Sequence, residues 1–211
     1  MTLSSKRFRD ALATVPTAVS VAATTDESGV PCAVTIGSLC SLSLDPPLVL
    51  FCLARGSSSH AVFRSADRFA VTVLAEDQAD VARCFAGPRA ARSRVPLQLV
   101  DRLPVVPGAV AHLLCSARAL VPGGDHTIII GEVQQAVVHC RRPLLHHQRE
   151  FYGLASSRAG ADDTEPLGEQ HGVEPVGSTE FAVQPLLVLG HRTRRQPELP
   201  GDRHCAQSLA E

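Results

Sequence analysis

Apolar and β-branched residues recur through most of the chain in short runs that are typical of strands. Two such runs flank Asp26–Gly29 within residues 18–36, which predicts a β-hairpin with glycine at the positive-φ position of the turn. Two longer strand patterns, residues 111–121 and 126–140, are joined by Pro122–Asp125, a strong turn signal. The pattern therefore predicts a mainly antiparallel β architecture, either a barrel or a sandwich.

Helical periodicity is confined to three short segments. Residues 4–15 predict an amphipathic helix capped by Ser4 or Ser5, with its apolar positions at helical spacing: Phe8, Leu12 and Val15. Residues 76–86 predict a second helix whose first turn carries acidic side chains, which favours the helix dipole. A third, short helix is expected after Ser57. The fold class predicted is therefore mainly β with a few short helices.

Residues 41–54 pass from alternating Ser and Leu through Pro46–Pro47 into an unbroken apolar run. The run Leu48–Ala54 lacks alternation, which predicts a strand buried on both faces. Proline has no N–H to donate, so we expect the double proline to stop strand pairing from continuing upstream. On this interpretation Ser41 and its neighbours are left to face a ligand.

The C-terminal quarter differs in composition from the rest. Residues 155–177 are rich in Gly, Asp, Glu and Ser, which is typical of a linker or disordered loop. Residues 179–191 regain apolar character and are expected to add a strand or to pack on a partner subunit. The predicted organisation is a β domain over residues 1–154 and a C-terminal extension over residues 155–211.

Composition excludes several classes of protein. The 211 residues carry a net charge of -1, which gives no basic surface for nucleic acid. No apolar run is long enough for a membrane span or signal peptide, so we expect a cytoplasmic protein. Seven cysteines without a Cys-x-x-Cys pair are interpreted as buried thiols in a reducing compartment. The charged fraction of 19% is low, which favours an oligomer.

No familiar catalytic motif is present: the chain lacks a nucleophile elbow, a paired metal-ligand motif, a P-loop and a Rossmann fingerprint. Small polar residues instead gather at the predicted strand ends, in the two clusters Thr35, Gly37, Ser38, Ser41 and Ser57, Ser58, Ser59. Short hydroxyls and free N–H groups suit a phosphate-bearing ligand, but such residues also build ordinary turns. The residues alone leave both interpretations open.

Four blocks in order carry a resemblance to a known family. They are VPTAVSVAATTDESGVPCAVTIGSLCSLSLDPPLVLFCL, RFAVTVLAEDQADVARCFAG, LPVVPGAVAHLLCSARALVPGGDHTIIIGEV and PLLHHQREFYGL. Together they span residues 8–154 and are similar to the short-chain flavin reductases. This resemblance implies a split β-barrel of Greek-key type that binds FMN.

The resemblance also implies site residues. Those assigned to the flavin ring, ribityl chain or phosphate are Thr35, Ser38, Ser41, Cys52, Ser57, Ser58 and Ser59. His126, in the pattern Gly-Gly-Asp-His, matches a family histidine near the flavin that helps to position the nicotinamide. If the resemblance to the family is set aside, His126 is interpreted as the end of a turn and Cys52 as a small core residue. Gly37, Leu39 and Thr72 depart from the family pattern.

The activity implied is an NAD(P)H:flavin oxidoreductase that uses NADH or NADPH to reduce FMN or FAD. It would supply reduced flavin to a flavin-dependent monooxygenase and form a homodimer. No metal is implied, because hydride transfer is carried by the two cofactors. The alternatives are a flavin-binding or electron-relay protein without nicotinamide turnover, and an interaction protein that kept the barrel but lost the site.

Overall fold

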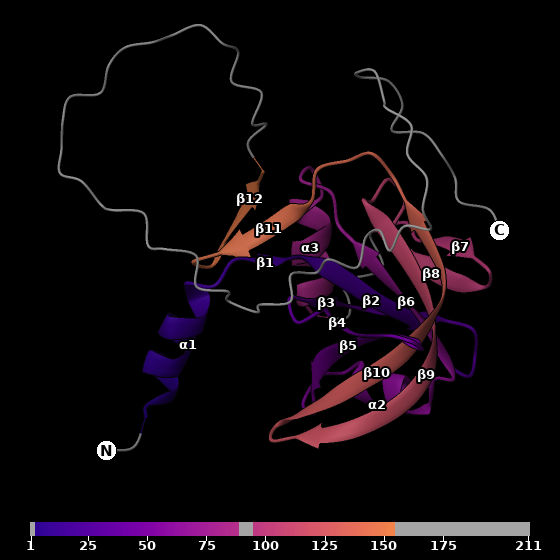
Figure 1. Cartoon of the computed structure of the whole chain (residues 1–211), viewed down its shortest axis with the longest axis horizontal. Coiled ribbons are helices and arrows are strands. Elements are labelled where there is room, and N and C mark those ends of the chain that lie inside the picture. The colour runs from indigo at the N-terminus through magenta and orange to yellow at the C-terminus, as the bar shows by residue number, and fades with distance from the viewer. Residues whose placement is uncertain (1–2, 89–94, 155–211) are drawn as a thin grey trace, which may run out of the picture. The chain divides into compact units, whose positions relative to one another are not determined.

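In a computed structural model that describes residues 3–88 and 95–154, antiparallel strands dominate the chain (Figure 1). The strands are β1 (Thr17–Ala18), β2 (Ser20–Thr25), β3 (Pro31–Ile36), β4 (Cys40–Leu44), β5 (Pro47–Ala54), β6 (Arg68–Val73), β7 (Gln98–Val100), β8 (Leu103–Val105), β9 (Ala111–Gly123), β10 (His126–Val138), β11 (Leu144–His147) and β12 (Glu150–Gly153). The helices are α1 (Ser5–Ala13), α2 (His60–Ser65) and α3 (Ala79–Ala86). The predicted mainly-β class is confirmed.

Seven strands form the main sheet, in the order β3-β2-β6-β9-β10-β5-β4. All neighbouring strands in it are antiparallel. The sheet curls so that edge strand β3 comes beside β5, although no ladder joins these two strands. The result is a barrel with an open seam between β3 and β5.

Aromatic side chains fill the barrel interior. Phe51 of β5 packs edge-on against Phe63 of α2 and Phe69 of β6, with ring centroids 5.8 and 5.5 Å apart. All three rings are almost fully buried. Helix α2 therefore contributes to the barrel core through Phe63, which fixes the turn that precedes this helix.

Other elements cover the outer face of β2, β3 and β6. Phe85 and Ala82 of α3 join Val21 of β2 in a second apolar cluster. The β7–β8 hairpin adds Leu103 and Val105 against the outer residues of β6 and β9. These layers bury the closed side of the barrel, whereas the seam has no such cover among the described residues.

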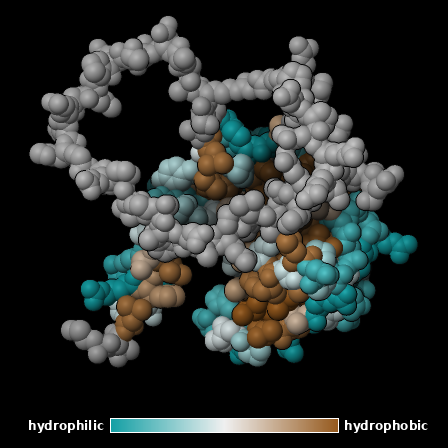
Figure 2. Space-filling model, in the orientation of Figure 1, coloured by the Kyte–Doolittle hydropathy of each residue, from teal (hydrophilic) through white to brown (hydrophobic). Residues whose placement is uncertain are grey.

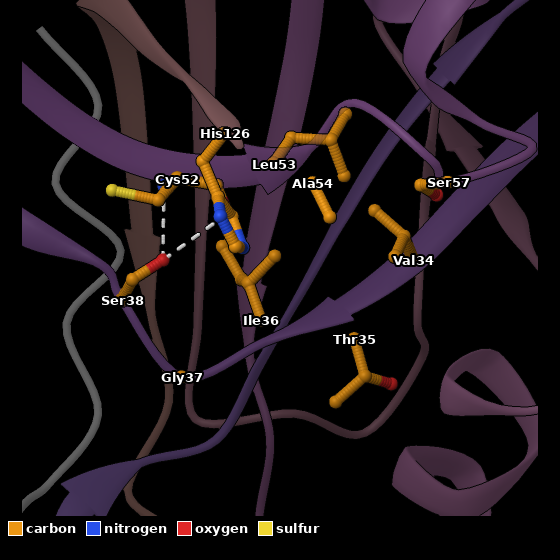
Figure 3. A pocket seen from close by; sticks show the side chains of 10 residues that line it. All are labelled: Val34, Thr35, Ile36, Gly37, Ser38, Cys52, Leu53, Ala54, Ser57 and His126. Atoms are coloured by element: carbon orange, nitrogen blue, oxygen red, sulfur yellow. Dashed lines mark hydrogen bonds between the residues drawn. The ribbon is translucent and has the colours of Figure 1, made fainter. Parts of the chain in front are cut away.

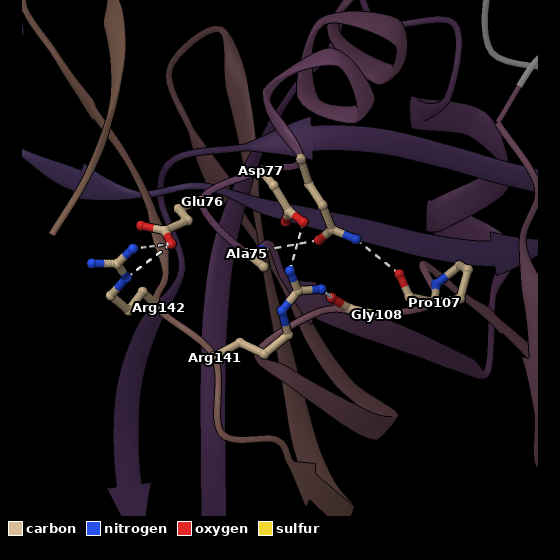
Figure 4. Close-up of polar contacts among 8 residues, drawn as sticks. Ala75, Glu76, Asp77, Pro107, Gly108, Arg141 and Arg142 are labelled. Carbon is tan, nitrogen blue, oxygen red and sulfur yellow. Dashed lines mark hydrogen bonds and ion pairs between the residues drawn. The ribbon is translucent and has the colours of Figure 1, made fainter.

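Helix α3 begins at Ala79, three residues later than the sequence predicts. The acidic residues expected in its first turn are occupied elsewhere, because Glu76 pairs with Arg142 and Asp77 with Arg141 (Figure 4). The Gln78 side chain accepts from the Ala75 N–H at 2.9 Å and donates to the Pro107 carbonyl at 2.8 Å. These contacts fasten the segment before β11 to the end of β6.

The prediction for the double proline was wrong. Strand pairing continues upstream of it, because β4 and β5 form a hairpin in which Leu44 pairs with Pro47 and Ser41 with Val49. The Asp45–Pro46 peptide bond is cis and lies in the turn of this hairpin. Proline thus makes the turn between two paired strands, and Ser41 is an exposed residue of an edge strand.

Strand β5 is buried on one face only, so the prediction of burial on both faces was also wrong. Val49, Phe51 and Leu53 point into the barrel, whereas the alternate residues from Leu48 onward are half-buried. The partner strand β10 repeats this pattern, with Ile129 inside and Ile128 and Ile130 half-buried outside. An apolar outer face results, and Figure 2 shows apolar surface in the region of β10.

Helix α1 forms where the sequence predicts, with the Ser4 side chain accepting from the Arg7 N–H. None of its residues is buried, and the Phe8, Leu12 and Val15 side chains are each more than half exposed. The helical spacing of Phe8 and Leu12 was therefore read correctly, although the helix ends at Ala13, before Val15. Among the described residues, nothing covers this apolar face. An ion pair between Asp10 and Arg149 ties the helix to the loop before β12.

The cysteines are less uniformly buried than the sequence suggests. Cys115 is fully buried, and this burial raises the pKa of its thiol to about 12. Cys40 is exposed, and Cys52 and Cys84 are half-buried. Cys140 is disulfide-bonded, so the expectation that all cysteines are buried thiols was wrong at this position. Among the described residues, no helix is both long and apolar enough to cross a membrane. The predicted strand at 179–191 and the extension 155–211 lie outside the described residues.

Candidate functional site: a cavity at the barrel seam

A cavity of about 340 Å³ opens at the seam between β3 and β5 (Figure 3). Its lining comes from β3 and the residues just after it, from the end of β5, from the following turn and from the start of β10: Val34, Thr35, Ile36, Gly37, Ser38, Cys52, Leu53, Ala54, Ser57 and His126. This volume lies within the range of small-molecule sites in proteins.

The position of β3 explains why the cavity is there. Strand β3 pairs with β2 alone, so one edge of its backbone has no ladder partner among the described residues. Main-chain N–H and C=O groups on such an edge can bind a ligand with complementary polar atoms, except at Ala33, which already has an interaction partner. Val34, Ile36 and Leu53 add apolar surface beside that edge. The seam thus combines apolar walls with backbone donors and acceptors.

His126 enters the cavity from the first position of β10, where it pairs with Ala54 of β5. Its Nδ1 lies 2.7 Å from Oδ1 of Asp125. This hydrogen bond to His126 lowers the pKa of the Asp125 carboxyl, so the group is an anionic acceptor near neutral pH. The Nδ1–H then donates to Asp125, and Nε2 is the ring nitrogen left for a ligand.

Ser38 fastens the two sides of the seam to each other. Its hydroxyl oxygen accepts from the Cys52 N–H at 2.9 Å and lies 3.4 Å from the Cys52 carbonyl oxygen (Figure 3). Ser38 follows β3, and Cys52 belongs to β5. Because the hydroxyl is engaged by the backbone of residue 52, Ser38 fixes the width of the seam at this point.

The Thr35 hydroxyl points away from the cavity. It donates to the Ala82 carbonyl oxygen of α3 at 2.8 Å. Position 35 therefore reaches the cavity through its main chain, and its side chain anchors the strand to the helix that covers it. The residue was selected correctly as part of the lining, but its hydroxyl is already bonded within the protein.

The three serines after β5 lie in different environments. Ser57 lines the cavity, and its hydroxyl accepts from the Ser59 N–H at 3.2 Å. Ser58 is exposed and Ser59 is buried, and neither lines the cavity. Ser41 also lies outside the lining. The structure therefore brings Thr35, Ser38, Cys52, Ser57 and His126 together, and it leaves the other three predicted residues apart.

Sequence reasoning placed the apolar strand that contains Leu53 beside the flavin but missed the apolar residues of β3, Val34 and Ile36. Selecting polar side chains at strand ends could not find them, because these residues read as ordinary core. The signal that could have found them is topological. They lie where an edge strand meets a strand with which it does not pair.

The residues present fit a flavin. An isoalloxazine ring is planar and largely apolar, with amide-like donors and acceptors along one edge, so it needs flat apolar walls and backbone partners. The cavity offers both through Leu53 and the free edge of β3. Among the described residues no cluster of side chains suited to a metal ion exists.

Comparison with known proteins identifies the family that has this fold. The actinorhodin polyketide dimerase of Streptomyces coelicolor is 40% identical over 157 residues, which cover 73% of this chain and 88% of that protein. The NADH-dependent FMN reductase SmoA of Agrobacterium fabrum is 39% identical over 142 residues, covering 67% and 81%. Further relatives are named as reductase components of flavin-dependent monooxygenases.

A solved structure shows the same fold. The NADH:FAD oxidoreductase of Streptomyces globisporus, in complex with NAD and FAD fragments, matches with a TM-score of 0.69 and 33% identity, over 75% of this chain and 99% of that one. The family model described as "Flavin reductase like domain" matches residues 12–155. The chain therefore belongs to the flavin reductase-like family and has its split-barrel fold.

Proposed function

We propose that the protein is an NADH-dependent flavin reductase whose site is the seam cavity. The observation that carries this proposal is the meeting of apolar walls, the main chain of residues 35–38 and the Asp125–His126 pair in one cavity of a member of this family. NADH is the donor named for the relatives from Agrobacterium and Streptomyces globisporus, and these two are named for FMN and FAD respectively. Either flavin is therefore a candidate here.

The protein's own groups orient the two cofactor rings and shield them from water. They do not transfer protons. When bound, the flavin accepts a hydride from the nicotinamide, so the protein needs no acid–base dyad. The edge of β3 supplies hydrogen bonds to the ring edge, and Leu53 and Ile36 exclude water from its face. His126, held by Asp125 through Nδ1, presents Nε2 toward the nicotinamide side. Holding two rings in near-attack contact supplies most of the catalysis available here.

Anaerobic oxidation of NADH and NADPH with added FMN, FAD or riboflavin tests the proposal. We expect flavin-dependent turnover that prefers NADH. His126→Ala should lower kcat/KM by on the order of 10- to 100-fold, because a positioning contact is lost. His147→Ala in β11, outside the cavity lining, is the matched control and should retain turnover. A wild-type protein that binds flavin but ignores both nicotinamides would instead support the electron-relay alternative.

We also propose that the reduced flavin leaves the protein for a flavin-dependent monooxygenase, as the names of several relatives suggest. A carrier of this kind should hold the flavin through modest backbone contacts, which is what the free edge of β3 offers. The test is whether an added apoflavodoxin captures the flavin during turnover. Retention of the reduced flavin on the protein would contradict this part of the proposal.

A homodimer is proposed from two apolar surfaces that the described residues of one copy leave uncovered. One is the outer face of β5 and β10, and the other is the exposed face of α1 (Figure 2). The outer face is continuous with the cavity, since Cys52 and His126 belong to both. Light scattering should give twice the chain mass, and Ile130→Glu should give monomers.

The proposed location is the cytoplasm. Nicotinamide dinucleotides are available inside the cell, and a reductase that consumes them needs that supply. Five described cysteines are free thiols, but Cys140 is disulfide-bonded, so the proposal rests on the supply of nicotinamide dinucleotide and not on the cysteines. Fractionation of the source cells tests this, and recovery outside the cytoplasm would contradict it.

A further inference from the structure

His60 stands at the start of α2, directly after the serine turn, and its side chain leaves the helix to contact a strand. Its Nε2 lies 2.9 Å from the Thr127 hydroxyl of β10. His60 is half-buried and Thr127 is buried, so water competes little for this hydrogen bond. The contact joins residues that are 67 positions apart in the chain.

The strand residue of this pair is adjacent to two groups of the cavity lining. Thr127 follows His126 directly and is paired with Leu53 across the ladder between β10 and β5. Side chains alternate along a strand, so the Thr127 hydroxyl reaches into the barrel end while the His126 ring takes the other face. Any shift of Thr127 along or across the ladder therefore moves His126 with it.

The helix residue is equally close to the other wall of the cavity. The His60 N–H donates to the Ser57 carbonyl at 3.0 Å, and the Ser57 N–H donates to the Ala54 carbonyl at 2.9 Å. The turn between β5 and α2 is thus a small set of local hydrogen bonds that begins in the cavity lining and ends at His60. A second link, from the Arg55 N–H to the Asp125 carbonyl, joins the same turn to the β9–β10 hairpin.

Beyond the β5–β10 ladder, two bonds hold the serine turn against the tip of the β9–β10 hairpin: one between main-chain atoms and one between the His60 and Thr127 side chains. The main-chain link lies at Asp125 and the side-chain link at Thr127, so the two bracket His126. With both in place, the distance between Ser57 and His126 across the cavity is fixed. Without the side-chain bond, the turn that carries Ser57 is held to β10 by main-chain contacts alone and can shift relative to His126.

We propose that His60 is a positioning residue for the seam site: through Thr127 it sets the place of His126 relative to the Ser57 wall. This inference rests on the proposed function, because the position of His126 matters only if a ligand occupies the cavity. His60 does not itself line the cavity and acts through Thr127. The residue was not among those selected from the sequence, where it reads as the first residue of a short helix.

The test compares two substitutions of the same kind at different places. Thr127→Val removes the hydroxyl that bonds His60. Thr24→Val removes an equally buried hydroxyl, which donates to the Arg68 carbonyl at 2.8 Å and lies outside the cavity lining. Both variants should lower the midpoint of denaturant unfolding by similar amounts. Only Thr127→Val should raise the dissociation constant for FMN, measured by quenching of flavin fluorescence, by on the order of tenfold.

His60 itself is tested with a conservative pair of variants. His60→Leu should weaken FMN binding as much as Thr127→Val, and the double variant should be no weaker than either single one. His60→Gln keeps a polar amide that can reach Thr127 and should stay within about twofold of the wild type, since one hydrogen bond is restored. In turnover, KM for NADH should rise more than kcat falls, because the ring of His126 is displaced rather than removed.

The outcomes separate this inference from the function on which it rests. A wild-type protein that neither binds flavin nor oxidises NADH would overturn both. A wild-type protein that binds flavin, with Thr127→Val and Thr24→Val losing equal stability and binding FMN as well as the wild type, would overturn the positioning role alone. In that case His60 would only anchor α2.

Discussion

The two sides of the barrel are built by different interactions. On the closed side, β2, β6 and β9 are joined by continuous ladders, and α3 with the β7–β8 hairpin covers their outer face. On the seam side, β3 and β5 approach without a ladder, and the Ser38 side chain links them. Ladders and buried apolar layers hold the closed side, so the seam can leave backbone groups open for a ligand. The closed side of the barrel therefore provides most of the stability, and the seam side provides the binding site.

The largest loss of stability is expected from a substitution in the core of the closed side. Phe69→Ala removes a buried ring that packs edge-on against Phe51 and also contacts Phe63. We expect a loss of about 3–5 kcal/mol in the free energy of unfolding, since little can collapse into the space. Urea unfolding followed by circular dichroism measures it. A loss below about 1 kcal/mol would show that the aromatic cluster is not the main support of the barrel.

A pair of glycine substitutions contrasts the two sides directly. A Cβ at Gly131 of β10 would collide with the Phe69 ring, so Gly131→Ala should cost about 1–3 kcal/mol of stability. At the seam, a Cβ at Gly37 would lie 3.3 Å from the Thr17 hydroxyl oxygen, a contact that a small shift relieves. Gly37→Ala should change stability by less than about 1 kcal/mol and weaken flavin binding instead. Equal stability losses at both positions would contradict the division.

Acid should weaken the closed side through a buried histidine. Burial lowers the pKa of His112, and the neighbouring His139 lowers it further, while Thr72 contacts its Nδ1. The unfolded chain then binds a proton below about pH 6.5 that the folded chain does not, so stability falls as the pH decreases below that value, by at most about 1.4 kcal/mol per pH unit.

Urea midpoints at pH 7.5, 6.5 and 5.5 measure this dependence. His112→Gln should flatten it, whereas His147→Gln in β11 should not. An unchanged slope in His112→Gln would mean that other groups govern the response to acid.

The smallest effect is expected at Ser20, inside the barrel at the start of β2. Its hydroxyl is buried and has no hydrogen-bond partner among the described residues. Ser20→Ala should leave stability unchanged or raise it by up to about 1 kcal/mol, because an unsatisfied polar group is removed. Thr24→Val, which removes a bonded hydroxyl on the same strand, should lower stability. A clear loss in Ser20→Ala would show that water or ligand satisfies this hydroxyl.

Local signals in the sequence predicted much of the fold. The turn at Asp26–Gly29 and the one at Pro122–Asp125 lie where strong turn residues placed them. Gly29 has the expected positive φ, and Gly124 in the second turn has a positive φ as well. The Pro46 turn was misread because a proline removes the ladder hydrogen bond only at its own position. It does not determine whether the residues on either side of it are paired. The start of α3 was misplaced because Glu76 and Asp77 meet arginines that lie far away in the sequence.

The site was predictable only where a polar residue marked it. His126 was found because the pattern around it is distinctive, and Ser38 because hydroxyls were sought. The hydroxyls of Ser38 and Thr35 nevertheless bond within the protein, a use that depends on which strands become neighbours. His60 was missed for the same reason, since its partner Thr127 lies in another hairpin. The roles of these residues in binding remain predictions until a flavin complex is measured.

The single serine link across the seam has a consequence for engineering. Because the Ser38 hydroxyl bonds the Cys52 main chain, a substitution at residue 38 can change the spacing at this point, while the β4–β5 ladder keeps the strands paired. The residue at position 38 therefore controls the width of the seam at this point. Smaller or larger residues at this position offer a graded series of slot widths, and such a series is the natural starting point for selecting variants that accept flavin analogues of altered size.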